Sequence, residues 1–212
     1  MKILLPHAAL EFPVDGDAIL RSIEKIGRVC YKSEDRITAE SAGKFIKAIL
    51  RRGHESVIEH ISVSVRVICD RGVSHEIVRH RIASYSQEST RYCNYTDNKF
   101  GAELAFIKPC FFEEDSEAYL LWRDSMEHAE KTYLRLIAGG AEPQHARSVL
   151  PNSLKTELVM TMNLREWRHF IRLRTAKASH PQMREIAFMI LALLKDNIPV
   201  IFEEFEMRGV TV

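Results

Sequence analysis

A ten-residue run that alternates apolar and polar side chains constrains the fold of this chain most. The run is HISVSVRVIC, residues 60–69, and it is rich in β-branched side chains. Such alternation predicts a β-strand with one buried face. Residues 70–81 then change to helical spacing, with Val73 and Ile77 on one side. The sequence therefore predicts a strand that leads directly into a helix.

The other periodic segments predict more helices than strands. Nothing repeats at a fixed period, and no low-complexity linker divides the chain. We therefore predict an α+β fold in which residues 1–212 form a single domain, with a mostly antiparallel central sheet covered by helices. The further strands are expected at residues 1–5, 104–107 and 154–162, and the helices after Asp15, from Thr38 to Gly53, and at 114–138, 142–149, 164–175 and 183–195.

Composition narrows the class of protein. The 30 basic and 29 acidic side chains leave a formal charge of +1, whereas nucleic-acid-binding domains usually carry a basic excess. No window approaches the ~18 apolar residues of a membrane span, and the N-terminal MKILLPHAALEF lacks the basic region of a secretion signal. The four separated cysteines are typical of a reducing compartment. We predict a cytoplasmic protein that binds neither membranes nor nucleic acid.

Residues 79–92, RHRIASYSQESTRY, are too polar for a core element. The run is expected to begin on the last turn of a helix and to continue as a loop from near Ser84. Forked guanidinium donors interspersed with hydroxyls suit a phosphate or a pyrophosphate. A solvated surface loop is the other interpretation, because loops are often polar.

A second polar feature lies on the helix expected after Asn163. Asn163 and Glu166 have the spacing of a capping box. Trp167 and its neighbours form an apolar face that Arg174 ends. A guanidinium there must pair with a carboxylate, reach past the apolar face to water, or serve a ligand.

Other chemistries find less support. His54 and His60 in GHESVIEH are six residues apart, whereas a zinc-protease helix needs histidines four apart, so no metal is expected. Serine or cysteine catalysis, for example by Cys93 near His80, needs an activating base and an orienting group, and no G-x-S-x-G elbow is present. The chain also lacks a G-x-G-x-x-G motif and a Walker loop.

The polar run resembles the signature of the flavin-dependent thymidylate synthases. The matching positions are Arg79, His80, Arg81, Ser84, Ser89 and Arg91. GHESVIEH, Arg147 before VLP, and NLREWRHFIRLR at 163–174 are similar to further segments of that family, in the same order. The resemblance covers residues from about 50 to 190.

The resemblance implies a homotetramer of α+β subunits with FAD sites where subunits meet. It implies reductive methylation of dUMP to dTMP, with methylenetetrahydrofolate as carbon donor, NADPH-reduced FAD as hydride source and no covalent enzyme nucleophile. The implied FAD contacts are His54, Ser56, Arg79, His80, Arg81, Gln87, Asn163, Leu164, Arg165 and His169. The implied dUMP contacts are Glu76, Arg79, Gln87, Glu88, Ser89, Thr90, Arg91, Arg147 and Arg174.

The resemblance also implies roles for single residues. Arg174 is the expected catalytic residue, which polarises the uracil ring, and Ser89 binds substrate without a covalent bond. Within the polar run, residues 79–81 are expected mainly to hold the flavin and residues 87–91 mainly to hold dUMP. Glu76 replaces the glutamine of many members, Gln87 stands in a variant SQES loop, and two extra residues precede His180. The alternative function is a non-catalytic nucleotide- or RNA-binding module that uses the basic loop 79–91.

Overall fold

A computed structural model describes residues 1–95 and 103–207 of the chain, which divides into two compact units. The polar run is split between them, since Arg79 and the residues from Ser86 onward belong to unit 1 and residues 80–85 belong to unit 2. Unit 1 takes its described residues from 1–7, 67–79 and 86–158, and unit 2 takes its described residues from 8–66, 80–85 and 159–212.

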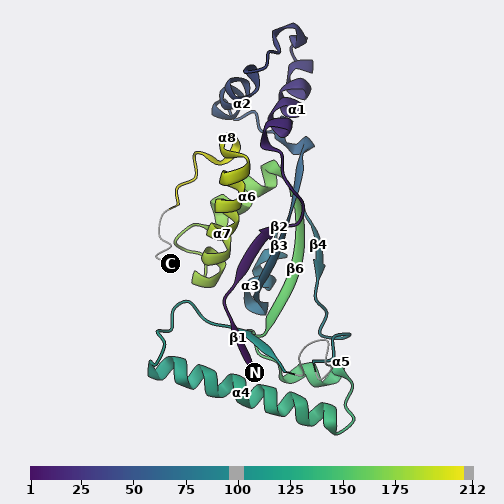
Figure 1. Ribbon diagram of the computed structural model, residues 1–212, viewed down its shortest axis with the longest axis vertical. Coiled ribbons are helices and arrows are strands. Elements are labelled where there is room, and N and C mark those ends of the chain that lie inside the picture. Colours follow the sequence, from purple (N-terminus) through teal and green to yellow (C-terminus); the bar gives the residue numbers. More distant parts are fainter. Residues whose placement is uncertain (96–102, 208–212) are drawn as a thin grey trace. The chain divides into compact units, whose positions relative to one another are not determined.

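The predicted α+β fold with a mostly antiparallel sheet is confirmed. At one end of β3 the N–H of Arg71 donates to the carbonyl of Leu154, and at the other end the N–H of Leu164 donates to the carbonyl of Ile61. The partner residue number falls as the β3 number rises, which is the antiparallel pattern. The strand order is β2 (His7–Leu10), β3 (Ser62–Asp70), β6 (Lys155–Asn163) and β4 (Ser84–Gln87), as Figure 1 shows.

Unit 1 contains a two-stranded parallel sheet and a long helix. Strand β1 (Lys2–Leu4) pairs with β5 (Ala105–Ile107). A core cluster that includes the fully buried Phe106 and Tyr133 fills this unit. The other elements of unit 1 are α3 (Arg71–Ile77), α4 (Glu117–Ala138), α5 (Pro143–Ala146) and the 3-10 helix η4 (Arg147–Val149).

Unit 2 is mainly helical. Its core includes Trp167, whose side chain is fully buried and whose indole N–H donates to the carbonyl of Val63 at 3.0 Å. Figure 1 shows α1 beside α2 and α6 beside α7. The elements are α1 (Gly16–Val29), η1 (Glu34–Arg36), α2 (Ser41–Arg51), η2 (Ser56–His60), α6 (Leu164–Arg174), α7 (Pro181–Asn197) and α8 (Pro199–Phe202).

Several local predictions are confirmed. The side chain of Asp15 accepts from the N–H of Ala18 and caps α1, and Gly53 adopts φ +73° just after α2. Asn163 accepts from the N–H of Glu166 at 2.8 Å and caps α6. These positions were predictable because caps and left-handed turns depend on single residue types.

Two local predictions about the polar run are wrong. The helix after β3 ends at Ile77, so Arg79 lies in the tight turn that follows it. The N–H of Arg79 donates to the carbonyl of Glu76. Residues 84–87 form strand β4 rather than a loop. The strand signal is weak because Ser84 and Ser86 on the exposed side are small and polar, whereas Tyr85 and Gln87 are only half-buried.

Three further findings complete the fold. Residues 56–60 form a 3-10 helix, and β2 and α8 had no clear signal in the sequence. Across residues 1–95 and 103–207, no helix is both long and apolar enough to cross a membrane. The interpretation of residues 1–212 as one functional domain stays a prediction.

Candidate functional site

Unit 1 contains a cavity of about 440 Å³, which we call the anion pocket. Thr90, which is 5% exposed, reaches it from the polar run. Its hydroxyl accepts from Nη1 of Arg147 at 3.3 Å, so a residue of the run meets the start of η4 here. The lining residues are Arg71, Thr90, Gln144, Arg147, Ser148 and Leu150.

Arg71 is the least expected residue of the anion pocket. Its N–H donates to the carbonyls of Asn152 and Leu154, which fixes the main chain at the start of α3. Its Nη1 atom is buried without a hydrogen-bond partner. Within the described part of the chain, neither Arg71 nor Arg147 forms an ion pair. Since a buried guanidinium nitrogen without an acceptor is unfavourable, Arg71 together with the exposed Arg147 suits a bound anion.

Gln87 of the polar run is anchored beneath the surface of unit 1. Its Nε2 donates to Oγ of Ser74 at 3.0 Å and to Oγ1 of Thr156 at 3.1 Å. Both hydroxyl residues are buried, with exposures of 0% and 1%. The amide nitrogen of Gln87 therefore points to the interior, and a ligand would contact the amide oxygen.

Glu88 is neutralised by a neighbouring cation. Its Oε2 lies 2.8 Å from Nζ of Lys155, and its Oε1 accepts from the hydroxyl of Tyr95 at 2.9 Å. Burial, together with the adjacent Glu88 charge, raises the pKa of Tyr95, so this hydroxyl keeps its proton and donates. A carboxylate held in this way is compatible with a nearby anionic ligand.

The remaining dUMP contacts predicted in unit 1 are more exposed. Arg79 and Arg91 are exposed, and the guanidinium carbon of Arg91 lies 5.5 Å from the ring centre of Tyr92. Oγ of Ser89 accepts from the N–H of Arg91 at 3.3 Å. Glu76 is half-buried and has an interaction partner. These residues offer charge and hydrogen-bonding groups at the surface.

Unit 2 contains a second cavity, of about 550 Å³, at the N-terminal turns of α6. We call it the α6 cavity. Arg165 lies in it and pairs with Glu59, while its Nε is 3.7 Å from Oε2 of Glu55. The α6 cavity therefore mixes cations with carboxylates. Its lining residues are Glu55, Glu59, Ile82, Asn163, Arg165, Glu166, His169 and Arg172.

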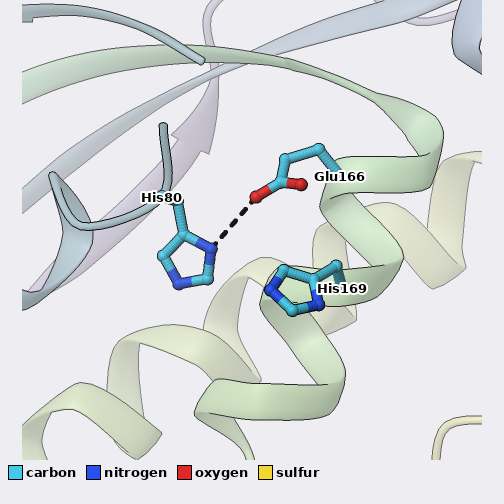
Figure 2. A group of neighbouring side chains, drawn as sticks. All are labelled: His80, Glu166 and His169. Atoms are coloured by element: carbon cyan, nitrogen blue, oxygen red, sulfur yellow. Dashed lines mark hydrogen bonds and ion pairs between the residues drawn. The ribbon is translucent and has the colours of Figure 1, made fainter. Parts of the chain in front are cut away.

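A buried hydrogen-bonded chain lies beside the α6 cavity, and Figure 2 shows its link between His80 and Glu166. Nδ1 of His80 is 3.2 Å from Oε1 of Glu166, and Nε of Arg174 is 3.0 Å from Nε2 of the same imidazole. Because a guanidinium only donates, Nε2 of His80 must be the acceptor. The imidazole proton therefore lies on Nδ1 and points to Glu166. His80 and Glu166 are 4% and 8% exposed.

The surroundings favour neutral His80. Burial lowers the pKa of His80, the charge of Arg174 lowers it further, and the hydrogen bond to Glu166 acts in the opposite direction. The hydroxyl of Tyr85 donates to the His80 carbonyl at 2.6 Å. Burial first, and then the charge of Glu166, raises the pKa of Tyr85 to about 12, so its hydroxyl remains a donor.

Ligand atoms of His80, Glu166 and His169 lie within 4.8 Å of one another, as in many metal sites (Figure 2). The sequence interpretation missed this group because its members come from distant segments and because Glu166 read as a capping residue. The guanidinium of Arg174 binds the same imidazole and adds a positive charge that opposes a second cation. The absence of a metal stays a prediction.

The other residues predicted to contact the flavin in unit 2 differ in accessibility. His54, Ser56 and Arg81 are exposed. Leu164 is fully buried, and its N–H donates to the carbonyl of Ile61. Arg174 also lies in unit 2, whereas the other predicted dUMP contacts lie in unit 1.

Comparison with known proteins gives matches over most of the chain. The sequence model of the family described as thymidylate synthase complementing protein matches residues 17–200. A flavin-dependent thymidylate synthase of Pyrococcus furiosus is 36% identical over 161 residues, which cover 76% of this chain and 65% of that relative. One of Mycolicibacterium vanbaalenii is 34% identical over 221 residues, covering 95% of this chain and 85% of the relative. This chain thus spans slightly less than two thirds of the Pyrococcus protein.

A solved structure is similar over nearly the full length. It is the UMP/dUMP methylase PolB from Streptomyces cacaoi, bound with 5-Br dUMP. The TM-score is 0.77 at 25% identity, and the match covers 97% of this chain and 96% of the other. The similarity therefore extends from local motifs to the whole fold.

Proposed function

Because the chain belongs to the thymidylate synthase complementing protein family, we propose that it converts dUMP to dTMP by reductive methylation. Methylenetetrahydrofolate is the carbon donor, and NADPH-reduced FAD is the hydride source. The observation that carries the proposal is the family match over residues 17–200, a range that includes every residue to which the resemblance assigns a ligand. Relatives named flavin-dependent thymidylate synthase and a structural neighbour named UMP/dUMP methylase support it.

In this proposal the anion pocket holds the phosphate of dUMP. Arg147 and Thr90 are joined there by a hydrogen bond, and Arg71 adds a buried nitrogen without a partner. A nucleotide monophosphate brings close to two negative charges and several acceptor oxygens, which match these donors. The carboxylate of Glu88 does not strongly repel the phosphate, since Lys155 lies 2.8 Å from this carboxylate.

Arg174 is the proposed catalytic residue. Carbon 5 of uracil is a poor nucleophile until the ring is polarised, and a fixed cation beside N3 and O2 stabilises the charge that develops. Arg174 is half-buried, and its partner His80 is neutral, so the hydrogen bond between them leaves the guanidinium charge intact. Ser89 holds substrate and forms no covalent bond to the ring.

The residues of the α6 cavity fit part of FAD. Its volume of about 550 Å³ lies in the range of small-molecule sites, and Asn163, Arg165 and His169 offer polar groups along one helix. His54, Ser56 and His80 would complete the flavin contacts in unit 2. The ion pair of Arg165 with Glu59 must open or be shared for Arg165 to reach a diphosphate. FAD, when bound, supplies the hydride chemistry that no side chain offers.

The test is dTMP formation from dUMP, methylenetetrahydrofolate and NADPH, measured with and without FAD. The purified protein is expected to be yellow or to become yellow with added FAD, and its absorption band is expected to bleach with anaerobic NADPH. A protein that takes up no FAD and forms no dTMP would overturn the proposal. If the protein instead bound RNA with an affinity that falls steeply with salt, the binding-module alternative would replace it.

We also propose a homotetramer with sites at subunit interfaces, located in the cytoplasm. Ile82 and Leu173 support the assembly, because these large apolar side chains are 68% and 47% exposed and lie close in sequence to His80 and Arg174. The four cysteines are free, which suits a reducing compartment. Light scattering should give four times the chain mass, and a monomer at assay concentration would contradict the assembly.

A further inference from the structure

We propose that Glu166 and His80 are positioning residues that orient the guanidinium of Arg174. The inference rests on the proposed function, in which Arg174 polarises the uracil ring. Its basis is the buried chain in which the Glu166 carboxylate accepts from the His80 imidazole and Nε2 of that imidazole accepts from Arg174. Glu166 thus acts on the reaction through two hydrogen bonds and touches no reacting atom.

The direction of both hydrogen bonds follows from the chemistry of the groups. Arg174 donates from Nε, so His80 must present a lone pair at Nε2. A neutral imidazole with a lone pair at Nε2 carries its proton at Nδ1, and this proton needs an acceptor because the ring is buried. Glu166 provides the acceptor 3.2 Å away. Removal of the carboxylate allows the other tautomer, whose Nε2–H faces a donor.

The hydrogen bonds from Glu166 through His80 also restrict the conformation of the Arg174 side chain. Arg174 is the last residue of α6, where a long side chain has many rotamers and costs conformational entropy to fix. Glu166 lies eight residues earlier on the same helix, about 12 Å along its axis. His80 bridges this separation. A hydrogen bond at Nε fixes the plane of the guanidinium and therefore the direction of its terminal nitrogens.

His80 is itself held by three residues, since it contacts Phe170 and Tyr85 as well as Glu166. Its imidazole centre lies 4.8 Å from the ring centre of Phe170, and its carbonyl accepts from the hydroxyl of Tyr85 at 2.6 Å. Glu166 is fixed in turn, because its N–H donates to the side chain of Asn163. Few alternative positions remain for the imidazole, so its tautomer controls whether Nε2 of His80 can accept from Nε of Arg174.

The arrangement makes turnover sensitive to protonation of His80. An imidazolium has a proton on both nitrogens and no longer accepts from Arg174. The titratable or charged groups around the ring are Glu166, His169 and Arg174 on α6 and Tyr85 on β4. Burial and the Arg174 charge favour the neutral ring, whereas Glu166 favours the proton. Loss of Glu166 is therefore expected to move the acid limb of kcat to lower pH.

The decisive experiment compares Glu166→Leu with Glu166→Gln in the flavin-loaded enzyme. Leucine fills the space but cannot accept, so kcat is expected to fall roughly 10-fold to 100-fold, as for a lost hydrogen bond of a charged group. The glutamine oxygen can accept from Nδ1–H, so Glu166→Gln should retain most of kcat. The KM for dUMP should change little in either variant, and kcat is compared at saturating FAD because Glu166 lines the α6 cavity.

Two controls separate positioning from a structural role. Glu24→Leu removes another buried glutamate, which pairs with Arg28 at 2.7 Å, and should lower stability without changing the pH profile of kcat. In an Arg174→Ala background, Glu166→Leu should cause no further loss of residual turnover, because its effect passes through Arg174. Equal kcat for wild type and Glu166→Leu, or additive losses in the double variant, would overturn the inference.

The tautomer gives a readout that is independent of activity. In flavin-free protein at pH 7.5, ¹⁵N NMR of the His80 ring should show a proton on Nδ1 in wild type and a gain of the Nε2–H form in Glu166→Leu. An Nε2–H tautomer in wild type would overturn the inference even if Glu166→Leu did not fold. If the NMR result holds but wild type forms no dTMP, the proposed function fails and the positioning role fails with it.

Discussion

The arginines of the anion pocket and those along α6 look equivalent in sequence but differ in their partners. Within the described residues, Arg71 and Arg147 have no carboxylate partner. Along α6, Arg165 pairs with Glu59, and Arg168 and Arg172 share Glu204. A cation already matched by a carboxylate has less to gain from a ligand than one left without an acceptor.

This contrast assigns different roles to residues of one type. The two cations of the anion pocket, Arg71 and Arg147, are suited to an external anion, whereas most of the α6 cations stabilise the protein itself. Arg174 differs from both groups, since its Nε donates to the imidazole of His80 at 3.0 Å. This hydrogen bond orients the guanidinium, and a fixed orientation is what a catalytic electrostatic role requires.

The largest expected effect is the fall in kcat when Arg174 is replaced. Arg174→Ala should lower kcat by about 10³-fold, because a preorganised cation at a developing charge contributes about 3 to 4 kcal/mol. The flavin should stay bound, since Arg174 is not among the predicted FAD contacts. The measurement is dTMP formation together with the FAD absorbance of the purified variant. Turnover within a few-fold of wild type would remove Arg174 from the mechanism.

The next largest effect is a higher KM for dUMP, which distinguishes the arginines that bind substrate from those that form ion pairs within the protein. Arg147→Met and Arg71→Met should each raise the KM for dUMP about 10-fold to 100-fold, since each loses a charge-assisted hydrogen bond to the phosphate. Arg123→Met is the matched control, because this exposed residue of unit 1 lies 3.9 Å from Glu127 and is expected to leave KM unchanged. A normal KM in Arg71→Met would limit the phosphate site to Arg147 and its exposed neighbours.

A smaller effect is expected from Arg168, the most buried arginine among the described residues. Arg168 is 2% exposed, lies 3.0 Å from Glu55 and 2.7 Å from Glu204, and also donates to the carbonyl of Ile201. Arg168→Met should lower the free energy of unfolding by about 2 to 3 kcal/mol, less than for a fully buried pair because Glu204 is half-exposed.

The kcat of the folded Arg168→Met enzyme should stay close to that of wild type, and urea unfolding with activity assays below the transition measures both quantities. Unchanged stability of Arg168→Met together with a lower kcat would show that Arg168 acts in function, as is proposed for Arg147, and would contradict the structural role that its ion pairs assign to it.

The sequence predicted the parts of this molecule that depend on local pattern. Alternation located β3, helical spacing located α4 and α7, and the side chain of Asn163 located the start of α6. The membership implied by the RHR signature is confirmed by the family match. Each of these signals is carried by residues close together in the chain.

The sequence did not predict features that depend on distant partners. Glu166 had the spacing of a capping residue, yet its carboxylate meets His80 from another segment. Arg71 had no role in the sequence prediction, and the reason to expect a ligand contact is its buried nitrogen beside the anion pocket. Strand β4 was missed because its pairing with β6 outweighs weak local propensity.

The smallest expected effect concerns His80 and the pH dependence of stability. Burial lowers the folded-state pKa of His80, whereas an unfolded histidine titrates near 6.5. As the pH falls through about 6.5, the unfolded state therefore takes up a proton first, and the free energy of unfolding falls until folded His80 is also protonated. One proton changes it by at most about 1.4 kcal/mol per pH unit.

Urea unfolding of flavin-free protein at pH 7.5 and 5.5 tests this effect. Wild type should lose about 1 kcal/mol more between the two pH values than His80→Gln, whose side chain does not titrate. His145→Gln, at an exposed histidine of unit 1, should retain the wild-type difference. An identical pH dependence in wild type and His80→Gln would mean that the pKa of His80 is the same in the folded and the unfolded protein, which contradicts the expected lowering. A smaller loss in wild type than in His80→Gln would mean that folding raises this pKa. The folded imidazole would then carry protons on both nitrogens near pH 6.5, and Nε2 would have no lone pair for Arg174.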